Sequence, residues 1–484
     1  MNTEEHLVYR KIFKATSLFG GVQGVSMLTS IVRSKVLALL IGTSGYGIYG
    51  FLNTIIELFK QFSGLGIETS GVKFISEAVD SQVVSKYNHT ISLLLKLSFA
   101  LGCFGVLAAI CMSPFLSWIV FSDTSKWFVF VFISISVLFN QLVATNNAIF
   151  QGSDKLVFLA KSNLYSNSIG LIITLPLFYF FKEDAIIPSI VIISIVNFIL
   201  STFYLSKIVK FNNSISFIQS FKEGKEMIRF GSLFVLMGFL PLVVNFALQF
   251  FINNKDGLHA VGLFNVSIIV LNTYVGFIFT IMATEYYPRL IKSITSNKSI
   301  SNTVCQQVKT SLLLVTPVVL FFVTFGQSII KFLFSNKFIE ITPMLNWALF
   351  GMVFKSISFS IGYIFIAKAD SKIFTKTSLF FNCLHFLLLY LGYLLYGFEG
   401  LGIAILVYYF LHFVVIFLIA KKRYAINFDP HLIYLIVASL SICTTVLMIK
   451  ILVKDNFVYL LSIFICATFL SFYKLKKLIS KDTI

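Results

Sequence analysis

A basic side chain stands among apolar residues in the first hydrophobic run of the sequence. Gln23, Ser26 and Ser30 precede Arg33 at intervals of three or four residues, and residues at this spacing share one face of an α-helix. A guanidinium group donates paired hydrogen bonds to carboxylates and phosphates. The first run therefore predicts a polar helix face on which Arg33 binds an anion.

A second polar face carries both an acid and a base. Asn53, Glu57, Lys60 and Gly64 recur at helical spacing in the next apolar run, and Glu57 precedes Lys60 by one turn, which allows an ion pair. Two interpretations stay open at this point. The pair either belongs to a binding site or only holds two helices together.

Further polar residues recur inside the apolar runs, although hydrogen bonding between helices explains many such residues in any bundle. An ionisable group at membrane depth costs about 2.5–3.5 kcal/mol, so each requires a reason. Five bases are placed so deeply, against one acid, Glu57. Together these residues predict a polar, net cationic cavity for an anion rich in hydroxyl groups. The bases are Arg33, Lys35, Lys60, Lys96 and Lys355, and the amides are Asn140, Asn147, Gln151, Asn245, Gln249, Asn265 and Asn272.

The apolar runs themselves predict a polytopic membrane protein. The chain has 484 residues, of which 57% are hydrophobic and 12% charged. Runs of about 20 apolar residues suffice to cross ~30 Å of hydrocarbon. We expect about fourteen such helices, at 15–40, 46–66, 91–121, 127–149, 158–181, 185–206, 227–252, 260–284, 309–334, 342–367, 374–397, 400–420, 431–450 and 456–473.

The basic residues predict the orientation of these helices. Most of the 38 Lys and Arg residues fall in alternate connections, and short cytoplasmic loops are rich in Lys and Arg. This pattern places both termini in the cytoplasm and the protein in the bacterial inner membrane. The net charge of +18 is spread over many loops, so it does not indicate nucleic-acid binding.

Patterns of soluble active sites are not found in the sequence. The six cysteines form no CxxC pair and have no partnering histidines, so we expect neither disulfides nor metal. His385 and His412 are most simply packing residues, with a proton relay as the alternative. Nucleotide-binding and hydrolase motifs do not occur. We therefore expect no cofactor and no enzymatic activity.

A weak internal repeat predicts two similar halves. Tyr46-Gly47-Ile48-Tyr49 resembles Val261-Gly262-Leu263-Phe264, and parallel repeats are typical of transporters that rock about a central site. The expected fold is all-α, with two six-helix bundles and a C-terminal helix pair. Its parts are an N-terminal bundle, an amphipathic cytoplasmic linker, a C-terminal bundle, and the helix pair with a tail, at 1–206, 207–228, 229–423 and 424–484.

Residues 15–78 resemble the opening of the Wzx-type polysaccharide flippases, which translocate O-antigen and enterobacterial common antigen units and belong to the MOP superfamily. The resemblance is carried by Arg33-Ser34-Lys35, the turn from Gly42 to Gly47, Gly64-Leu65-Gly66 and Ser70-Gly71-Val72-Lys73. Over the rest of the chain only the helix pattern and the two halves agree. The expected fourteen helices exceed the twelve common among these flippases.

This resemblance implies that the protein moves an undecaprenyl-diphosphate-linked oligosaccharide across the inner membrane by alternating access, for surface polysaccharide biosynthesis (O-antigen, lipopolysaccharide, capsule or exopolysaccharide). The polyprenyl tail would stay in the membrane lipid. Polysaccharide polymerase machinery is a possible partner, and a monomer is expected. The predicted substrate-binding residues are Arg33, Lys60, Lys355, Glu57, Gln23, Ser30, Asn53, Asn140, Asn147, Asn245 and Gln249.

Three alternatives differ in cargo or in class. A lipid II flippase shares the fold class. A MATE-type antiporter for drugs or cations is expected to have more acids in its cavity than Glu57 alone. A membrane-embedded glycosyltransferase or ligase is expected to have a large periplasmic loop, whereas the connections here are short. The driving force is left open between an ion gradient, the membrane potential and removal of the product.

Overall fold

The computed structural model describes residues 24, 27–209, 216–453 and 457–481. Within these ranges the chain is built of helices and contains no β-strand. The predicted all-α polytopic membrane fold is confirmed. Contacts divide the chain into two compact units, residues 1–262 and 263–484. The finer division into two bundles, a linker and a helix pair stays a prediction.

Nine segments of the described residues are long and apolar enough to cross a membrane. Three of them are 51 to 55 residues long, and each contains a break, at the 3-10 turn Lys182–Ala185, at Gly257, or at Tyr396 and Gly397. With these breaks, the nine segments correspond to the predicted spans from the third to the fourteenth. They are Val84–Cys111, Thr124–Gly152, Leu156–Ser206, Gly238–Lys292, Asn297–Leu333, Asn336–Ala367, Ser371–Tyr424, Pro430–Leu452 and Phe457–Lys477.

The first two predicted spans are helical where they are described. Residues 27–40 form a helix, and α2 follows at Gly42–Gly64. Helix α2 is not among the nine segments because its glycines and its polar residues Asn53, Glu57 and Lys60 lower its hydropathy. Gln23 lies outside the described residues.

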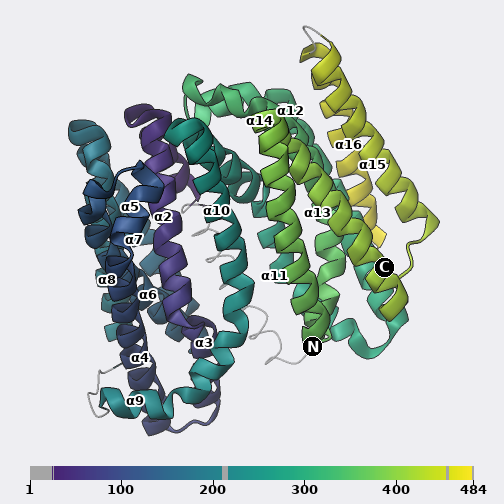
Figure 1. Ribbon diagram of the computed structural model, residues 1–484. Helices are drawn as coiled ribbons and strands as arrows, with labels where there is room; N and C mark the ends of the chain where they lie inside the picture. Colours follow the sequence, from purple (N-terminus) through teal and green to yellow (C-terminus); the bar gives the residue numbers. More distant parts are fainter. Residues whose placement is uncertain (1–23, 25–26, 210–215, 454–456, 482–484) are drawn as a thin grey trace. The chain divides into compact units, whose positions relative to one another are not determined.

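Helices α2, α3, α4, α5, α7 and α8 of the first unit contact α6, and α9 packs on α4 (Figure 1). A buried cluster including Ile75, Leu94, Leu97 and Phe150 joins α3, α4 and α6. These apolar residues fix the helices that carry polar side chains on their other faces. The helices are α3 (Ile67–Asp80), α4 (Val84–Cys111), α5 (Ser113–Phe121), α6 (Trp127–Gly152), α7 (Leu156–Phe181), α8 (Ile186–Ser206), α9 (Phe217–Glu223) and the long α10 (Lys225–Ile269).

Polar contacts join α6 to its neighbours within the apolar packing. The Asn146 amide donates to the Ser201 hydroxyl over 2.9 Å and to the Thr202 hydroxyl over 3.2 Å. Ser98 on α4 bonds Thr145. A hydroxyl or amide in hydrocarbon is costly unless it is hydrogen-bonded, so these pairs fix which helix faces meet.

Helix α9 lies within the predicted amphipathic linker. Its Glu223 carboxylate is 2.7 Å from Nε2 of His89 on α4. Gln219 and His89 both bond this carboxylate and hold its pKa below the usual range. Ile218 is 86% exposed, and Phe217 and Phe221 are also exposed. An exposed apolar face beside a basic one is typical of a helix on a membrane surface.

The second unit consists of the helices after residue 262 (Figure 1). Helices α13 and α14 pack closely, and α12 contacts α13, α15 and α16. The C-terminal pair is therefore attached through α12. The helices are α11 (Phe277–Lys292), α12 (Asn297–Leu333), α13 (Thr342–Ala367), α14 (Ser371–Tyr424), α15 (Pro430–Leu452) and α16 (Phe457–Lys481), with a π-helical turn at Val270–Val275 before α11.

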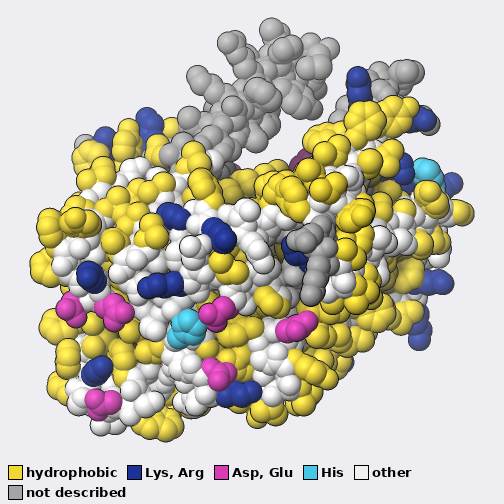
Figure 2. All heavy atoms as spheres, turned by 90° about the horizontal axis from the view of Figure 1, so that it is seen from above, with side chains coloured by type: hydrophobic (Ala, Val, Ile, Leu, Met, Phe, Trp, Pro, Cys, Tyr) yellow, Lys and Arg dark blue, Asp and Glu magenta, His cyan; other side chains and the backbone are white. Residues whose placement is uncertain are grey.

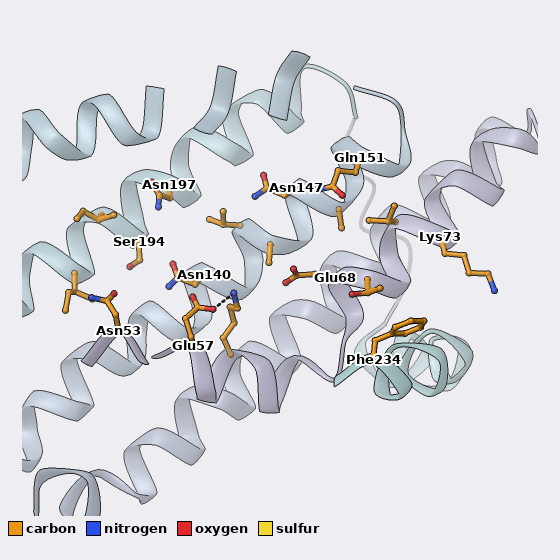
Figure 3. Close-up of a pocket in the computed structure, with 18 of the residues that line it drawn as sticks. Asn53, Glu57, Glu68, Lys73, Asn140, Asn147, Gln151, Ser194, Asn197 and Phe234 are labelled. Atoms are coloured by element: carbon orange, nitrogen blue, oxygen red, sulfur yellow. Dashed lines mark ion pairs between the residues drawn. The ribbon is translucent and has the colours of Figure 1, made fainter. Parts of the chain in front are cut away.

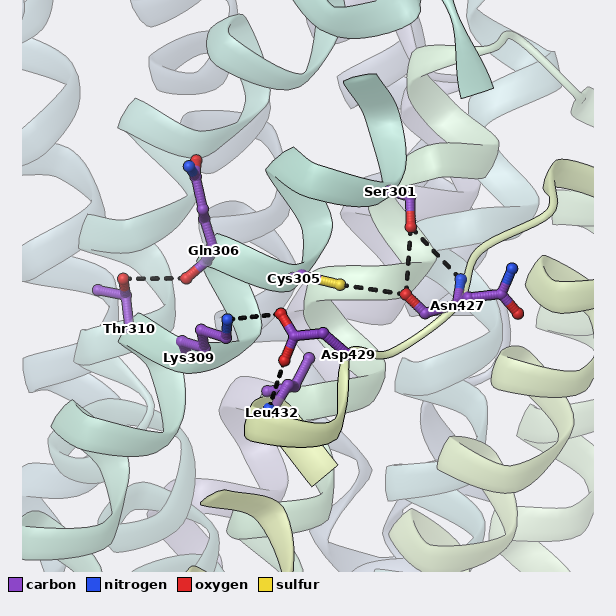
Figure 4. A network of polar contacts seen from close by, with 8 residues as sticks. All are labelled: Ser301, Cys305, Gln306, Lys309, Thr310, Asn427, Asp429 and Leu432. Atoms are coloured by element: carbon purple, nitrogen blue, oxygen red, sulfur yellow. Dashed lines mark hydrogen bonds and ion pairs between the residues drawn. The ribbon is translucent and has the colours of Figure 1, made fainter. Parts of the chain in front are cut away.

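A polar network ties the connection between α14 and α15 to α12 (Figure 4). The Lys309 ammonium is 2.7 Å from the Asp429 carboxylate, and the Ser301 hydroxyl donates to the carbonyl of Asn427 over 3.3 Å. Nearby, the Tyr424 hydroxyl and the Arg423 guanidinium hold the pKa of Asp370 below its usual range. The contacts of Lys309 and Ser301 hold the start of the C-terminal helix pair against α12.

Large apolar side chains remain exposed along many helices, among them Leu28, Ile172, Phe180, Phe332 and Phe469, each more than 60% exposed. Charged side chains of both signs lie among hydrophobic ones at the helix ends seen in Figure 2. A soluble protein rarely leaves so much large apolar surface exposed, whereas lipid provides an apolar solvent for it. The exposure fits a multi-pass membrane protein.

Replacing Asn146 with Leu should destabilise the first unit. The variant loses the hydrogen bonds to Ser201 and Thr202, and such interhelical bonds contribute about 0.6 kcal/mol on average and up to about 1.7 kcal/mol. We expect a lower thermal unfolding temperature of the purified protein in detergent. Asn254→Leu is the matched control because Asn254 is exposed. Equal unfolding temperatures for the two variants would contradict the structural role of Asn146.

Candidate functional site

The first unit contains a cavity of about 960 Å³ at membrane depth (Figure 3). Helices α2, α3, α6 and α8 contribute most of its wall, and α10 contributes two phenylalanines. The polar lining residues are Arg33, Tyr49, Asn53, Glu57, Lys60, Glu68, Thr69, Lys73, Asn140, Asn147, Gln151, Ser194 and Asn197.

An ion pair on α2 faces this cavity. The Lys60 ammonium is 2.6 Å from the Glu57 carboxylate, one helical turn away. The Lys60 side chain is 17% exposed and the Glu57 side chain 43% exposed. An ammonium buried to this extent is stabilised by the adjacent carboxylate, whose exposed side remains accessible from the cavity. The i, i+3 spacing in the sequence sets this geometry directly.

Arg33 lines the cavity from residues 27–40. One terminal nitrogen donates to the carbonyl of Asn167 over 3.4 Å, and Nε is buried without a hydrogen-bond partner. Gly170 on α7 leaves room for this guanidinium, because a Cβ there would lie 3.3 Å from its terminal nitrogen. A guanidinium with unused donors is suited to bind an anion.

Amide side chains form a wall opposite α2. Asn140, Asn147 and Gln151 follow one face of α6, and Asn197 extends this wall from α8 (Figure 3). The carbonyl oxygens of Asn147 and Asn197 are buried without partners. An amide carries both a hydrogen-bond donor and an acceptor, so this wall is suited to ligands that carry hydroxyl groups.

The cavity is less cationic than the sequence predicted. Of the five deep bases, only Arg33 and Lys60 line it. Lys73 adds a third base, but Glu68 joins Glu57 as a second acid. Glu68 lies just beyond the second predicted span, 46–66. In the structure α3 begins directly after the turn at Leu65 and Gly66, both in the left-handed region, and this turn brings Glu68 to the cavity.

Several predicted binding residues lie elsewhere. Gln249 is fully buried and donates to the Thr54 hydroxyl over 2.9 Å, and Asn245 faces the same hydroxyl at 3.4 Å. These two amides therefore join α10 to α2 and do not line the cavity. Ser30 is exposed and also lies outside the lining.

Lys355 belongs to the second unit, on α13. Its ammonium lies 5.3 Å from the ring centres of Phe279 and Tyr409. The neighbouring residues Ser356 and Ser360 are fully buried and bond within the helix bundle. These serines therefore serve the packing of the bundle, and the Lys355 ammonium lies near two aromatic rings.

His385 and His412 are part of an aromatic stack on α14. The His385 ring stacks on Tyr408 at 4.2 Å, and the His412 ring meets Phe381 at 4.5 Å. This arrangement agrees with the packing interpretation. In the described ranges, no group of three or more His, Cys, Asp or Glu side chains is arranged to hold a metal ion.

Some lining residues were not predicted. Asn197 follows Ser194 by three residues and precedes Ser201 by four in an apolar run, so the helical spacing that identified Asn147 and Gln151 could have indicated it. Phe230 and Phe234 on α10 also line the cavity. Phenylalanine is too common in this chain, with 56 copies, for any pattern to select these two.

A family model described as polysaccharide biosynthesis protein matches residues 36–343. The match covers more than half of the chain, so the chain belongs to this polysaccharide biosynthesis family. No curated protein matches the sequence.

Solved structures show the same fold at low identity. The lipid II flippase MurJ, in an inward closed conformation, is 14% identical, with a TM-score of 0.72 over 96% of this chain and 99% of that chain. An inward-facing MATE family multidrug transporter of the MOP superfamily is 13% identical, with a TM-score of 0.62 over 84% and 94%. A MATE transporter from Vibrio cholerae is 16% identical, with a TM-score of 0.58 over 88% and 99%.

These comparisons confirm the predicted family of polysaccharide flippases with a MOP-superfamily fold. The structural neighbours are named as a flippase and as transporters. Membership in this family agrees with the prediction that the protein is not an enzyme. At these identities the structural matches show the fold, and the cargo has to be argued from the cavity.

Replacing Glu57 with Gln should strengthen binding of a polyvalent anion. The change removes the carboxylate that pairs with Lys60, and a charge-assisted bond to the released ammonium is about twice as strong as a neutral one. We expect the dissociation constant of inorganic pyrophosphate, measured by calorimetry on purified protein, to fall several-fold. Asp80→Asn, an exposed acid outside the cavity, is the control. Weaker binding in Glu57→Gln would exclude competition between carboxylate and ligand for Lys60.

Proposed function

We propose that this protein is a flippase that moves an undecaprenyl-diphosphate-linked oligosaccharide from the cytoplasmic to the periplasmic leaflet of the bacterial inner membrane. The product would supply surface polysaccharide such as O-antigen, capsule or exopolysaccharide. The observation that carries the proposal is the cavity at membrane depth, which combines bases with an amide wall. Membership in the polysaccharide biosynthesis family supports it.

The two kinds of lining residue match the two parts of such a head group. Arg33 and Lys60 supply cationic donors for the diphosphate, since guanidinium and ammonium groups bind phosphate by charge-assisted bonds. Asn53, Asn140 and Asn147 supply amides for sugar hydroxyls. The volume of about 960 Å³ is at the upper end of the 300–1,000 Å³ usual for ligand pockets.

The lipid tail would stay outside the cavity. The exposed apolar side chains along the helices give a polyprenyl chain the same surroundings as the bilayer, so only the head group needs a polar route. Transport would proceed by alternating access, as expected of paired repeats. We further propose that both termini are cytoplasmic, that the protein acts as a monomer and that polymerase machinery consumes the product.

Lipid II is the second candidate cargo. A structure of the lipid II flippase MurJ matches this chain over 96% of its length and covers 99% of its own. Lipid II and polysaccharide precursors share the undecaprenyl diphosphate, so the same bases would serve both. Complementation of a strain depleted of its lipid II flippase separates the two cargoes: rescue favours lipid II.

Arg33→Ala and Lys60→Ala should each abolish surface polysaccharide in a strain that depends on this protein. Each change removes a cavity cation that captures the diphosphate, while the protein remains in the membrane at the wild-type amount. Surface polysaccharide is measured by gel and immunoblot, and protein by blotting the membrane fraction. Lys126→Ala, in the connection before α6, is the control. Wild-type polysaccharide in both cavity variants would reject the assignment.

A further inference from the structure

Within the first unit, the segment of α10 before Gly257 lies beside α2 and runs antiparallel to it (Figure 1). At mid-length the Thr54 hydroxyl accepts a hydrogen bond from Gln249 over 2.9 Å. The rings of Phe51 and Phe246 meet close by, with centres 5.6 Å apart. The helix pair is therefore joined by side chains at its middle.

At one end of the pair the two backbones touch directly. A Cβ added to Gly231 on α10 would lie 2.6 Å from the carbonyl oxygens of both Leu65 and Gly66. A Cβ added to Gly66 would overlap the carbonyl of Gly231, and Gly66 also has a φ of +68°. Phe230 and Phe234, on either side of Gly231, line the cavity. This contact therefore lies at one end of the cavity.

At the other end a second pair of glycines touches. A Cβ on Gly47 would overlap the carbonyl of Leu258, and a Cβ on Gly262 would overlap the carbonyl of Thr43. Each of these Cβ atoms would also lie 3.0 Å from the backbone nitrogen of the opposite glycine. The Thr43 hydroxyl and Nδ1 of His259 are 2.6 Å apart in the same contact.

The two contacts flank the part of the cavity that α2 lines. Gly47 and Gly66 are separated by about 28 Å at 1.5 Å per helical residue, close to the ~30 Å thickness of membrane hydrocarbon. The cavity-lining residues of α2, which include Asn53, Glu57 and Lys60, all lie between them. In each glycine contact, the backbone of α2 or of its end therefore lies directly against the backbone of α10 near one membrane face.

A break in α10 separates the partners of the two contacts. Gly231 precedes Gly257, whereas Leu258 and Gly262 follow it, and Gly257 has a φ of +76° that interrupts the helix. Nothing lies within 4 Å of a Cβ built there, so only the backbone conformation favours glycine. The segments before and after Gly257 can therefore rotate relative to each other about this residue. Hinges in proteins are a few residues that absorb such changes in φ and ψ.

We propose that the two glycine contacts are the two gates of the cavity. The Gly66–Gly231 contact closes the face predicted to be cytoplasmic, and the Gly47–Gly262 contact closes the opposite face. The inference rests on the proposed transport function. Contacts made by backbone separate and re-form without unpacking interdigitated side chains, whereas an added methyl group prevents the close approach and holds that gate open.

Accessibility of the cavity tests the proposal. The reporter is Asn53→Cys, in a background with the six native cysteines replaced, labelled by a membrane-impermeant maleimide. Gly231→Ala should speed labelling in inside-out vesicles, and Gly262→Ala should speed labelling in right-side-out spheroplasts. We expect at least about a fivefold change in rate, because overpacking of about 1 kcal/mol shifts a two-state equilibrium by that factor.

Gly362→Ala is the matched control, because nothing lies within 4 Å of a Cβ at Gly362. Gly231 and Gly262 are preferred to Gly66 as test positions, since the positive φ of Gly66 would add backbone strain to the steric effect. Faster labelling from opposite faces, as assigned, supports the gates. Control rates in either variant, or faster labelling from one face in both, overturns the proposal.

A second measurement acts on protein that has already folded. Thr43→Cys with His259→Cys, joined by a short bifunctional maleimide, should hold the Gly47–Gly262 gate closed. Lipid translocation in proteoliposomes should then stop in the cross-linked protein and continue in the untreated double variant. Translocation after cross-linking overturns the gate. If the wild type moves no lipid-linked oligosaccharide while labelling follows the gates, the cargo proposal fails and the gates stand.

Discussion

The ion pair between Glu57 and Lys60 sets the requirements for the rest of the first unit. Two charges at membrane depth, 2.6 Å apart on one face of α2, are expensive unless neighbouring helices enclose them and supply polar groups. Helices α6 and α8 do so with amides. The remaining faces of α2 then have to pack tightly, and small residues allow its backbone to approach α10 closely. Helix α2 therefore both lines the cavity and makes the glycine contacts proposed as its gates.

The helices themselves were predictable because hydrocarbon thickness imposes the length of each apolar run. The breaks at Gly257 and at Tyr396 and Gly397 fall close to predicted span ends. The Asn140, Asn147 and Gln151 stripe was also found, since three polar residues on one face of α6 require a polar neighbour. Asn245 and Gln249 show the limit of this reasoning. Periodicity identifies a polar face, but only the tertiary structure shows that this face meets Thr54.

The charge of the cavity was harder to predict for a related reason. Glu68 and Lys73 follow the end of α2, where linear reasoning places residues at the membrane boundary. The left-handed residues Leu65 and Gly66 reverse this expectation by starting α3 at an angle that returns both side chains to the cavity. The surroundings of Lys355 could not be predicted from its own segment either, because the aromatic rings beside it come from α11 and α14. Such placements depend on turns and on distant helices.

The contact of Gly47 with Gly262 is reciprocal: each glycine approaches the carbonyl located four residues before the other. These glycines also occupy equivalent positions in the two weakly similar motifs of the sequence. Equivalent residues that meet each other lie on a local twofold axis, the arrangement of an isologous dimer. A half-length ancestor carrying this glycine would make the same contact with a second copy of itself. Gene duplication and fusion would then preserve a dimer interface inside a single polypeptide, with both copies of the glycine constrained together.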